Sequence, residues 1–175
     1  MSTDAAWLDD HIRVIEDYPQ AGVTFRDITP LLRDQRAFGA TIDAIADHYA
    51  EAQIDTVIGI EARGFIVAAP VAYRLKAGFV PVRKAGKLPW AVAREEYQLE
   101  YGTDKLEIHR DAIRPGERVV IVDDVLATGG TASAALRLVE ALGAHVVGLG
   151  FIIELGDLGG RARVASPDVM SLLRY

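Results

Sequence analysis

The segment VVIVDDVLATGGTASAALRL, residues 119–138, indicates the fold class of this chain. Four apolar residues lead directly into Asp123 and Asp124, and a loop of small and hydroxyl residues, 127–131, then opens a helical pattern. A continuous apolar run is typical of a strand that is buried on both faces of a parallel sheet. Ligands of such sheets bind beyond the carboxyl ends of the strands, where the two aspartates are predicted to lie.

The loop after the aspartates has the composition of an anion site. Gly129 and Gly130 let backbone N–H groups turn toward one point, while Thr128 and Thr131 add hydroxyl donors. The N-terminus of the following helix also attracts a phosphate. Because two carboxylates would repel a phosphate beside them, we expect a sugar in between, with its hydroxyls on the acids. The segment therefore predicts a ribose 5-phosphate site, and its acids would also stabilise positive charge on the ribose ring.

Strands and helices are predicted to alternate along the rest of the chain. Apolar runs predict strands over 56–60, 79–84, 118–122 and 145–153. Helical spacing of apolar residues predicts helices over 5–16, 35–51, 65–75 and about 131–142, and residues 95–109 read as an antiparallel hairpin. This order predicts an α/β fold, a mostly parallel sheet flanked by helices, in a single domain spanning 1–175. The hairpin and the tail from about residue 154 are expected outside the core of the sheet.

Composition narrows the classes of function. The chain has 175 residues, half of them hydrophobic, and a formal charge of −6, which argues against nucleic-acid and membrane-surface partners. It has no cysteine, so disulfides and thiolate metal sites are excluded. No apolar stretch has the length of a signal peptide or a transmembrane helix, and a cytoplasmic protein is expected. The four histidines show no metal-ligand spacing; they are His11, His48, His109 and His145.

The sequence lacks the motifs of two other kinds of nucleotide-binding site. No G-x-x-x-x-G-K-[ST] motif is present, and GLGFII (148–153) lacks the third glycine of a dinucleotide fingerprint. A plainer interpretation of residues 119–138 stays open, in which a capped helix simply follows a core strand.

Arg63 follows the predicted strand 56–60, and its guanidinium offers a fork of donors for diphosphate oxygens. The plainer alternative is a surface arginine in a turn.

The stretch VVIVDDVLATGGT (119–131) resembles the motif by which type I phosphoribosyltransferases bind phosphoribosyl diphosphate (PRPP). Four further stretches resemble the adenine phosphoribosyltransferases of that class: GVTFRDITPLL (22–32), GIEARGF (59–65), VPVRKAGKLP (80–89) and YQLEYGTDKLEIH (97–109). The last twenty residues match the family more loosely. The resemblance implies the type I phosphoribosyltransferase fold, with a small hood (1–34) that recognises the base and a flexible flap (90–110). It also implies a homodimer.

The reaction implied by the resemblance transfers the ribose 5-phosphate of PRPP to N9 of adenine, giving AMP and pyrophosphate in purine salvage. The expected cofactor is Mg²⁺, which would arrive with the diphosphate and have no direct protein ligand. Glu100 is implied as the catalytic acid/base of the flap. The ribose 5-phosphate residues implied are Asp123, Asp124, Ala127, Thr128, Gly129, Gly130 and Thr131. Those for pyrophosphate are Arg63, Arg83, Lys84 and Lys87, and those for adenine are Val23, Phe25, Arg26 and Val125.

Individual residues add physical support to this assignment. Phe25 can stack on a flat heterocycle, with a core aromatic as its alternative, and the backbone around it would read the edge of the base. The loop that contains Arg63 often has a cis peptide bond before a residue other than proline in this family. The basic run at 83–87 is either a diphosphate clamp or a solvated surface, and some of its contacts are implied to cross a dimer interface.

Two other functions remain open at this point. The nearer is a purine phosphoribosyltransferase that uses guanine, hypoxanthine or xanthine, since the preference for adenine comes only from the resemblance. The more distant is a regulator that binds PRPP without transferring it. A basic face for DNA would favour the regulator, and the acidic composition argues against one.

Overall fold

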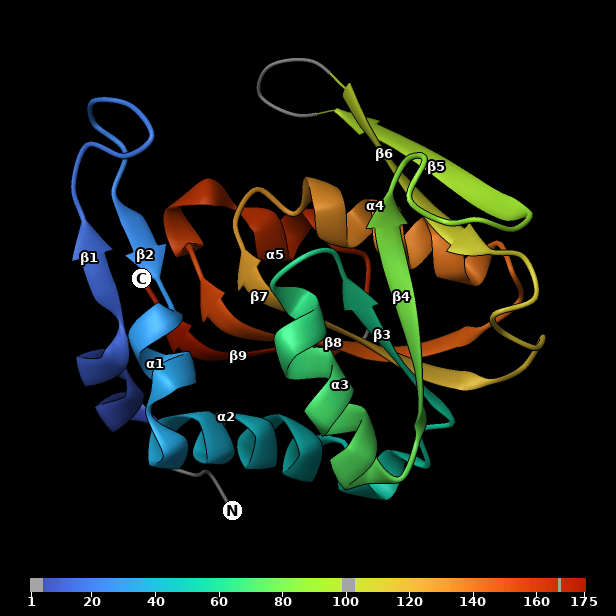
Figure 1. Cartoon of the computed structure of the whole chain (residues 1–175), viewed down its shortest axis with the longest axis horizontal. Coiled ribbons are helices and arrows are strands. Elements are labelled where there is room, and N and C mark those ends of the chain that lie inside the picture. The colour runs from blue at the N-terminus through green and yellow to red at the C-terminus, as the bar shows by residue number, and fades with distance from the viewer. Residues whose placement is uncertain (1–4, 99–102, 167) are drawn as a thin grey trace.

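A seven-stranded sheet forms the centre of the protein (Figure 1). The structure is a computed structural model, and it describes residues 5–98, 103–166 and 168–175. Within these ranges the strand order is β5-β6-β4-β3-β7-β8-β9. The strands are β3 (Thr56–Ile60), β4 (Gly78–Lys84), β5 (Val92–Gln98), β6 (Thr103–His109), β7 (Arg118–Leu126), β8 (His145–Glu154) and β9 (Val169–Arg174). All pairings from β4 to β9 are parallel, whereas β6 pairs antiparallel with β4 and β5. The predicted mostly parallel α/β fold is confirmed.

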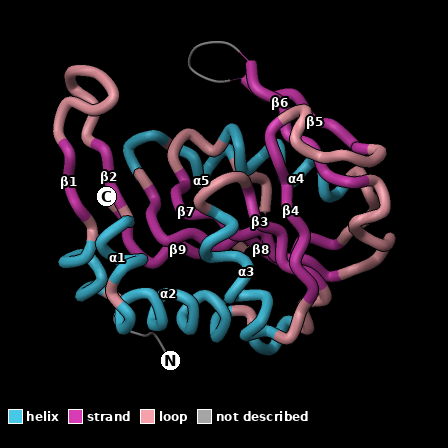
Figure 2. Tube along the Cα trace, in the orientation of Figure 1, coloured by secondary structure: helices cyan, strands magenta, loops and turns pink. Residues whose placement is uncertain are grey.

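Helices cover both faces of the sheet (Figure 2). Helices α2 (Gln35–His48) and α3 (Gly64–Leu75) pack on one face, and α4 (Gly130–Glu140) packs on the other. The shorter helical segments are α1 (Thr29–Arg33), α5 (Gly160–Arg163), η1 (Ala6–His11), η2 (Ala50–Ala52) and η3 (Gly156–Leu158). Among the helices of the described residues, none combines the length and apolar character needed to cross a membrane.

Strand β7 shows why the apolar run 119–122 is continuous. Val120 and Val122 pack into the cluster on the α2 and α3 side, whereas Val119 and Ile121 pack into the cluster on the α4 side. All four side chains are fully buried. Complete burial of one such side chain contributes about 1.5–3 kcal/mol to folding. The two clusters therefore hold the carboxyl end of β7, with its aspartates, in a fixed position.

The predicted helix over residues 5–16 is wrong in its second half. Only η1 is helical, and it is followed by the strand β1 (Arg13–Ile15), which pairs antiparallel with β2 (Phe25–Asp27). The helical spacing is real, because Leu8 and Ile12 are buried. After that point, backbone hydrogen bonds to β2 and an ion pair of 3.5 Å between Arg13 Nη1 and Asp27 Oδ2 favour the extended chain. Long-range pairing thus overrides a local pattern.

The hairpin and the tail both belong to the sheet, contrary to the expectation from sequence. Strand β6 pairs with β4 through Arg83 with Glu107 and Lys84 with Leu106. Leu106 and Ile108 are buried, so the hairpin contributes to the core on the α4 side. At the opposite edge β9 pairs in parallel with β8. Pairing satisfies backbone groups that an open edge of the sheet would leave exposed.

Candidate active site

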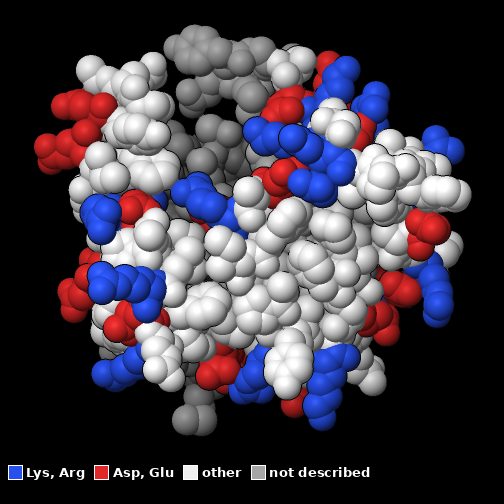
Figure 3. Space-filling view, in the orientation of Figure 1, with Lys and Arg blue, Asp and Glu red and all other residues white. Residues whose placement is uncertain are grey.

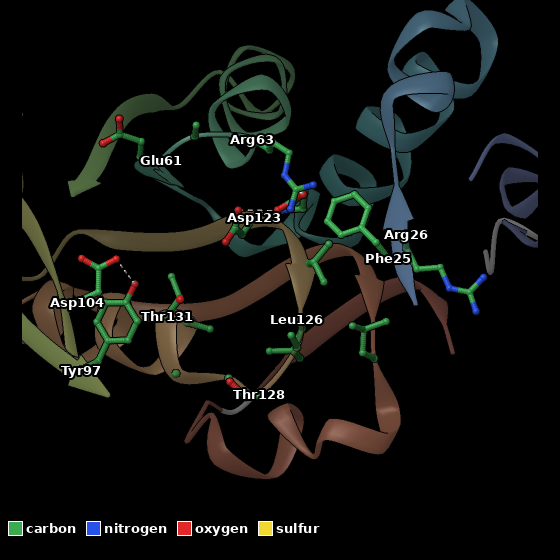
Figure 4. A pocket seen from close by; sticks show the side chains of 18 of the residues that line it. Phe25, Arg26, Glu61, Arg63, Tyr97, Asp104, Asp123, Leu126, Thr128 and Thr131 are labelled. Atoms are coloured by element: carbon green, nitrogen blue, oxygen red, sulfur yellow. Dashed lines mark hydrogen bonds and ion pairs between the residues drawn. The ribbon is translucent and has the colours of Figure 1, made fainter. Parts of the chain in front are cut away.

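A cavity of about 690 Å³ opens at the carboxyl ends of the parallel strands (Figure 4). Glu61, Lys84, Leu126 and Leu155 lie at or just after the ends of β3, β4, β7 and β8, and all four line it. Thirteen of the residues predicted for substrate binding also line it: Val23, Phe25, Arg26, Arg63, Lys84, Asp123, Asp124, Val125, Ala127, Thr128, Gly129, Gly130 and Thr131. The structure therefore brings together segments separated by about a hundred residues in the sequence.

The two aspartates lie at the floor of this cavity. Asp124 is 5% exposed and Asp123 is half-buried, and the backbone N–H of Asp124 donates to Oδ1 of Asp123 at 2.9 Å. Burial, together with the adjacent charge of Asp124, raises the pKa of Asp123 well above its usual value. Burial also raises the pKa of Asp124, against the opposing effect of the Arg63 guanidinium. The carboxyl group of Asp124 is thus short of solvent partners, and both side chains can accept hydrogen bonds from hydroxyl groups of a ligand.

Arg63 connects the acids with the aromatic side of the cavity. Its Nε lies 2.8 Å from Oδ2 of Asp124, and its guanidinium carbon lies 5.5 Å from the ring centroid of Phe25. In the same loop, the peptide bond between Glu61 and Ala62 is cis, as the resemblance implies. Gly64 lets helix α3 start next to the acids, because a Cβ there would come within 2.6 Å of Asp123 Oδ1.

The loop 127–131 is held between β7, α4 and α5. Gly129 has a φ of +77°, which favours glycine, and α4 begins at the next residue. Segment α5 lies directly against this loop, since a Cβ on Gly160 would come within 2.1 Å of the carbonyl oxygen of Ala127. This bracing contact was not predicted, and the adjacent glycines Gly159 and Gly160 are the signal in the sequence that could have indicated it.

The three cations of the basic run take different positions. Lys84 lines the cavity, with Nζ at 3.4 Å from Oδ2 of Asp104. Arg83 is instead paired with Glu61, with Nη2 to Oε1 at 3.0 Å, and its Nη1 donates to the carbonyl of Lys87 at 3.1 Å. Burial alone would raise the pKa of Glu61, but hydrogen bonds from Arg83 and from the Lys84 N–H keep it below its usual value. Of these cations, only Lys84 is among the described residues that line the cavity.

The residues expected for the base lie at the other end of the cavity. Phe25 faces it and is braced by Tyr18, with ring centroids 5.3 Å apart. The side chain of Arg26 points away from Phe25 in Figure 4, and its guanidinium lies over the Tyr175 ring at 4.0 Å. The side chain of Arg26 thus packs on Tyr175, which leaves its backbone as the part that can contact the edge of the base, in agreement with the expectation from sequence.

Several lining residues were not predicted. Tyr97 and Asp104 face the cavity from the hairpin, and the Tyr97 hydroxyl donates to Oδ2 of Asp104 at 3.4 Å. The alternation that predicted the hairpin gave no sign of this role. Glu61, which is in the same stretch as Arg63, was also missed. The predicted catalytic Glu100 lies outside the described residues.

The described residues contain no group of three or more histidine, aspartate or glutamate side chains arranged to hold a metal ion. Asp123 and Asp124 are the acids at the predicted ribose site. Among the described residues, Oδ2 of Asp124 has no hydrogen-bond partner apart from its ion pair with Arg63. A protein-only cage for a divalent cation is therefore not formed by the part of the chain that the structure describes.

Comparisons with known proteins agree over nearly the whole chain. Residues 14–171 match the Phosphoribosyl transferase domain. An adenine phosphoribosyltransferase of Desulfitobacterium hafniense (strain Y51) is 56% identical over 167 residues, which cover 95% of this chain and 96% of that protein. The crystal structure of adenine phosphoribosyltransferase from Rhodothermus marinus is 49% identical, with a TM-score of 0.93 and full coverage of both chains. That of the Saccharomyces cerevisiae enzyme, complexed with an imino-altritol bisphosphate and adenine, is 41% identical, with a TM-score of 0.93 and coverage of 98% and 99%.

Proposed function

This chain belongs to the adenine phosphoribosyltransferase family, and on that premise we propose how its residues perform the reaction. The enzyme is a pentosyltransferase of purine salvage, which transfers the ribose 5-phosphate of PRPP to N9 of adenine and releases AMP and pyrophosphate. One observation carries the assignment of residues. An aromatic ring, two adjacent acids and an anion loop line a single cavity in the order in which a nucleotide presents its base, ribose and phosphate (Figure 4).

Asp123 and Asp124 hold the ribose in this proposal. Their carboxylates accept hydrogen bonds from its hydroxyls, while the N–H and hydroxyl donors of residues 127–131 hold the 5′-phosphate. The low exposure of Asp124 supports this role, because a buried carboxylate without a full set of donors gains most from a hydroxyl partner. The same two charges stabilise the positive ribose ring as the bond from C1′ to pyrophosphate breaks.

Pyrophosphate leaves with the bonding electron pair, and cations of the protein stabilise its charge. We assign this role to Arg63 and Lys84 in the cavity and to Arg83 and Lys87 nearby. Mg²⁺ would arrive with the diphosphate and, when bound, would neutralise part of the charge of the leaving group. Asp123 and Asp124 fit such an ion, because oxygen ligands suit Mg²⁺ and Oδ2 of Asp124 is buried with no hydrogen-bond partner among the described residues. They would hold it indirectly, through ribose hydroxyls and water.

Adenine is bound by the hood (1–34), in which Phe25 stacks on the ring and the backbone around Val23 and Arg26 reads its edge. Val125 packs on the other face of the base. N9 attacks C1′, and Glu100 takes the proton of the attacking nitrogen. The flap (90–110) excludes water, which would otherwise capture the ribosyl cation.

A homodimer and a cytoplasmic location are also part of the proposal. The surface over α3 and β4 is largely uncharged (Figure 3), and Ile66, Tyr73 and Phe79 are exposed there by 46%, 87% and 38%. An apolar face of this kind is typical of a subunit interface. In such a dimer, some contacts of the basic run at 83–87 with pyrophosphate would cross the subunit interface. The absence of cysteine agrees with the cytoplasm.

Turnover with four separate purines tests the proposal. The purified protein is incubated with PRPP and Mg²⁺ and with adenine, hypoxanthine, guanine or xanthine, while nucleotide and pyrophosphate release are followed. We expect AMP from adenine alone. Turnover only with an oxo-purine would overturn the assignment of residues 22–27 to adenine. PRPP binding without turnover of any base would point to the regulator.

A further inference from the structure

Glu107 on β6 is a buried carboxylate that the reaction scheme does not use. Its side chain is 2% exposed. Oε2 accepts a hydrogen bond from the Gly86 N–H at 2.8 Å, and Oε1 accepts from Arg94 Nε at 2.8 Å and also from Arg94 Nη2. These donors hold the pKa of Glu107 below its usual value although burial would raise it. A buried charge is costly unless it is paired in this way, so its position calls for an explanation.

The partners of Glu107 belong to two different functional segments. Gly86 lies in the basic segment, defined as residues 83–87, which carries the cations proposed for pyrophosphate. Arg94 lies on β5, in the hairpin that leads to Glu100. One carboxylate therefore ties the basic segment to both strands of the hairpin, next to the pairing of Arg83 with Glu107 across β4 and β6.

A second acid holds the basic segment from the other side. Glu61 accepts from Arg83 Nη2 at 3.0 Å, and its Oε2 accepts from the Lys84 N–H at 3.0 Å. Glu61 lines the cavity, whereas Glu107 is not among the described residues that do so. Glu107 thus acts on the basic segment from outside the cavity.

We propose that Glu107 is a positioning residue of the pyrophosphate site, which sets the backbone of the basic segment through the Gly86 N–H. This inference rests on the proposed role of that segment in binding pyrophosphate. The proposed role of Glu107 is the same whether the cations of the basic segment bind pyrophosphate in their own cavity or in that of a partner subunit. In both cases Glu107 fixes the backbone that carries these cations.

A long-range electrostatic effect of Glu107 would change pyrophosphate affinity in the opposite direction from a positioning role, so the two can be distinguished by experiment. Loss of the Glu107 charge would leave Arg94 unpaired and would increase the positive potential near the cations. A pure field effect therefore predicts tighter pyrophosphate binding when Glu107 is neutralised. A positioning role predicts weaker binding, even in a variant that keeps the charge.

Glu107→Asp keeps the charge but shortens the side chain, so one carboxylate can no longer reach both Gly86 and Arg94. We expect pyrophosphate affinity, measured by calorimetry with Mg²⁺ on the full chain, to fall by about tenfold, the size of one charged hydrogen bond. KM for adenine should stay unchanged. Glu107→Gln keeps the length and an acceptor for Gly86, and it should lose less affinity than Glu107→Asp.

Two further variants separate the possible outcomes. Tyr49→Phe removes a buried hydrogen bond of 2.9 Å to the Leu149 carbonyl, far from the cavity, and controls for lost stability alone. Lys84→Ala tests the proposed site itself. If Lys84→Ala binds pyrophosphate normally, the proposed site fails. If Lys84→Ala weakens binding but Glu107→Asp does not, or if Glu107→Gln binds more tightly, only the role of Glu107 is overturned. A loss in Tyr49→Phe equal to that in Glu107→Asp would overturn it as well.

Discussion

The guanidinium of Arg63 and the carboxylate of Asp124 form an ion pair within the cavity, with Nε 2.8 Å from Oδ2. In the proposed reaction these groups bind different parts of PRPP, Arg63 the diphosphate and Asp124 the ribose. PRPP carries partners for both, so its binding would exchange one protein ion pair for two contacts with the substrate. Burial raises the pKa of Asp124, and the Arg63 guanidinium opposes that rise by favouring the ionised carboxylate.

Arg63→Gln should therefore change the pH dependence as well as the rate. Loss of the guanidinium raises the pKa of Asp124 further, so the ionised form is lost at a higher pH. We expect kcat/KM for PRPP to fall by at least about tenfold, as for a lost charged hydrogen bond. In the pH profile of kcat/KM, the decline on the acid side should move to higher pH. Arg74→Gln is the matched control, because Arg74 lies near the far end of α3 and pairs with exposed Asp43. An unmoved acid limb would contradict the coupling of Arg63 to Asp124.

Asp123→Asn should stabilise the protein while it impairs the enzyme. Because folding raises the pKa of Asp123, its ionised form destabilises the native state above the folded pKa, and this cost disappears as the pH falls. We expect the free energy of unfolding to increase by about 1 kcal/mol at pH 8 and to change little at pH 4. KM for PRPP should rise. Urea unfolding at both pH values measures the effect, and a variant less stable than the wild type at pH 8 would contradict it.

Glu100→Gln should lower kcat by about 100-fold or more, the usual effect of losing a general acid/base. Adenine affinity should change little, because the proposed role concerns the proton of the attacking nitrogen rather than binding. Steady-state kinetics with adenine and PRPP measures both quantities. Glu96→Gln, two positions before the hairpin strand ends, is a matched control whose glutamate pairs with Lys105. Near-normal turnover of Glu100→Gln would remove Glu100 from this role.

Phe25→Leu should raise KM for adenine by about tenfold, because aromatic stacking contributes about 0.5–1.5 kcal/mol beyond its buried area. KM for PRPP should remain close to that of the wild type, since Phe25 lies at the base end of the cavity. Initial rates with each substrate varied in turn give the two constants. Equal increases in both would indicate that Phe25 supports the cavity as a whole instead of the base.

Glu154→Gln should reveal a stabilising ion pair at the edge of the sheet. Hydrogen bonds from Arg161 lower the pKa of Glu154 from 4.5 to about 2, and its side chain is 2% exposed. Its stabilising effect, about 2–3 kcal/mol, is present above the unfolded pKa and is lost as the pH falls toward 2. Urea unfolding should show a larger difference from the wild type at pH 7 than at pH 3. The same difference at both pH values would show that the ion pair does not titrate as described.

Local patterns in the sequence predicted the parts of the site that form within one segment. The run 119–131 contains a strand, the two acids, the anion loop and the start of a helix. The position of the acids and the loop at the carboxyl end of β7 therefore followed from chain connectivity alone. The prediction failed where distant segments meet. Residues 13–15 were expected to be helical because nothing local shows that β2 pairs with them. The contact of Gly160 with Ala127 was missed for the same reason.

The alternation of strands and helices, the buried strand β7 and the residue types suited to ribose, phosphate and diphosphate could all be predicted from the sequence. These depend on the order of apolar and polar residues over a few positions, which is local information. The folded chain was needed to show that Arg63 pairs with Asp124, that Arg83 pairs with Glu61 and that Glu107 accepts a hydrogen bond from Gly86. Such pairs depend on strand order and packing between segments, and the energy of a charged contact depends on burial that no single segment encodes.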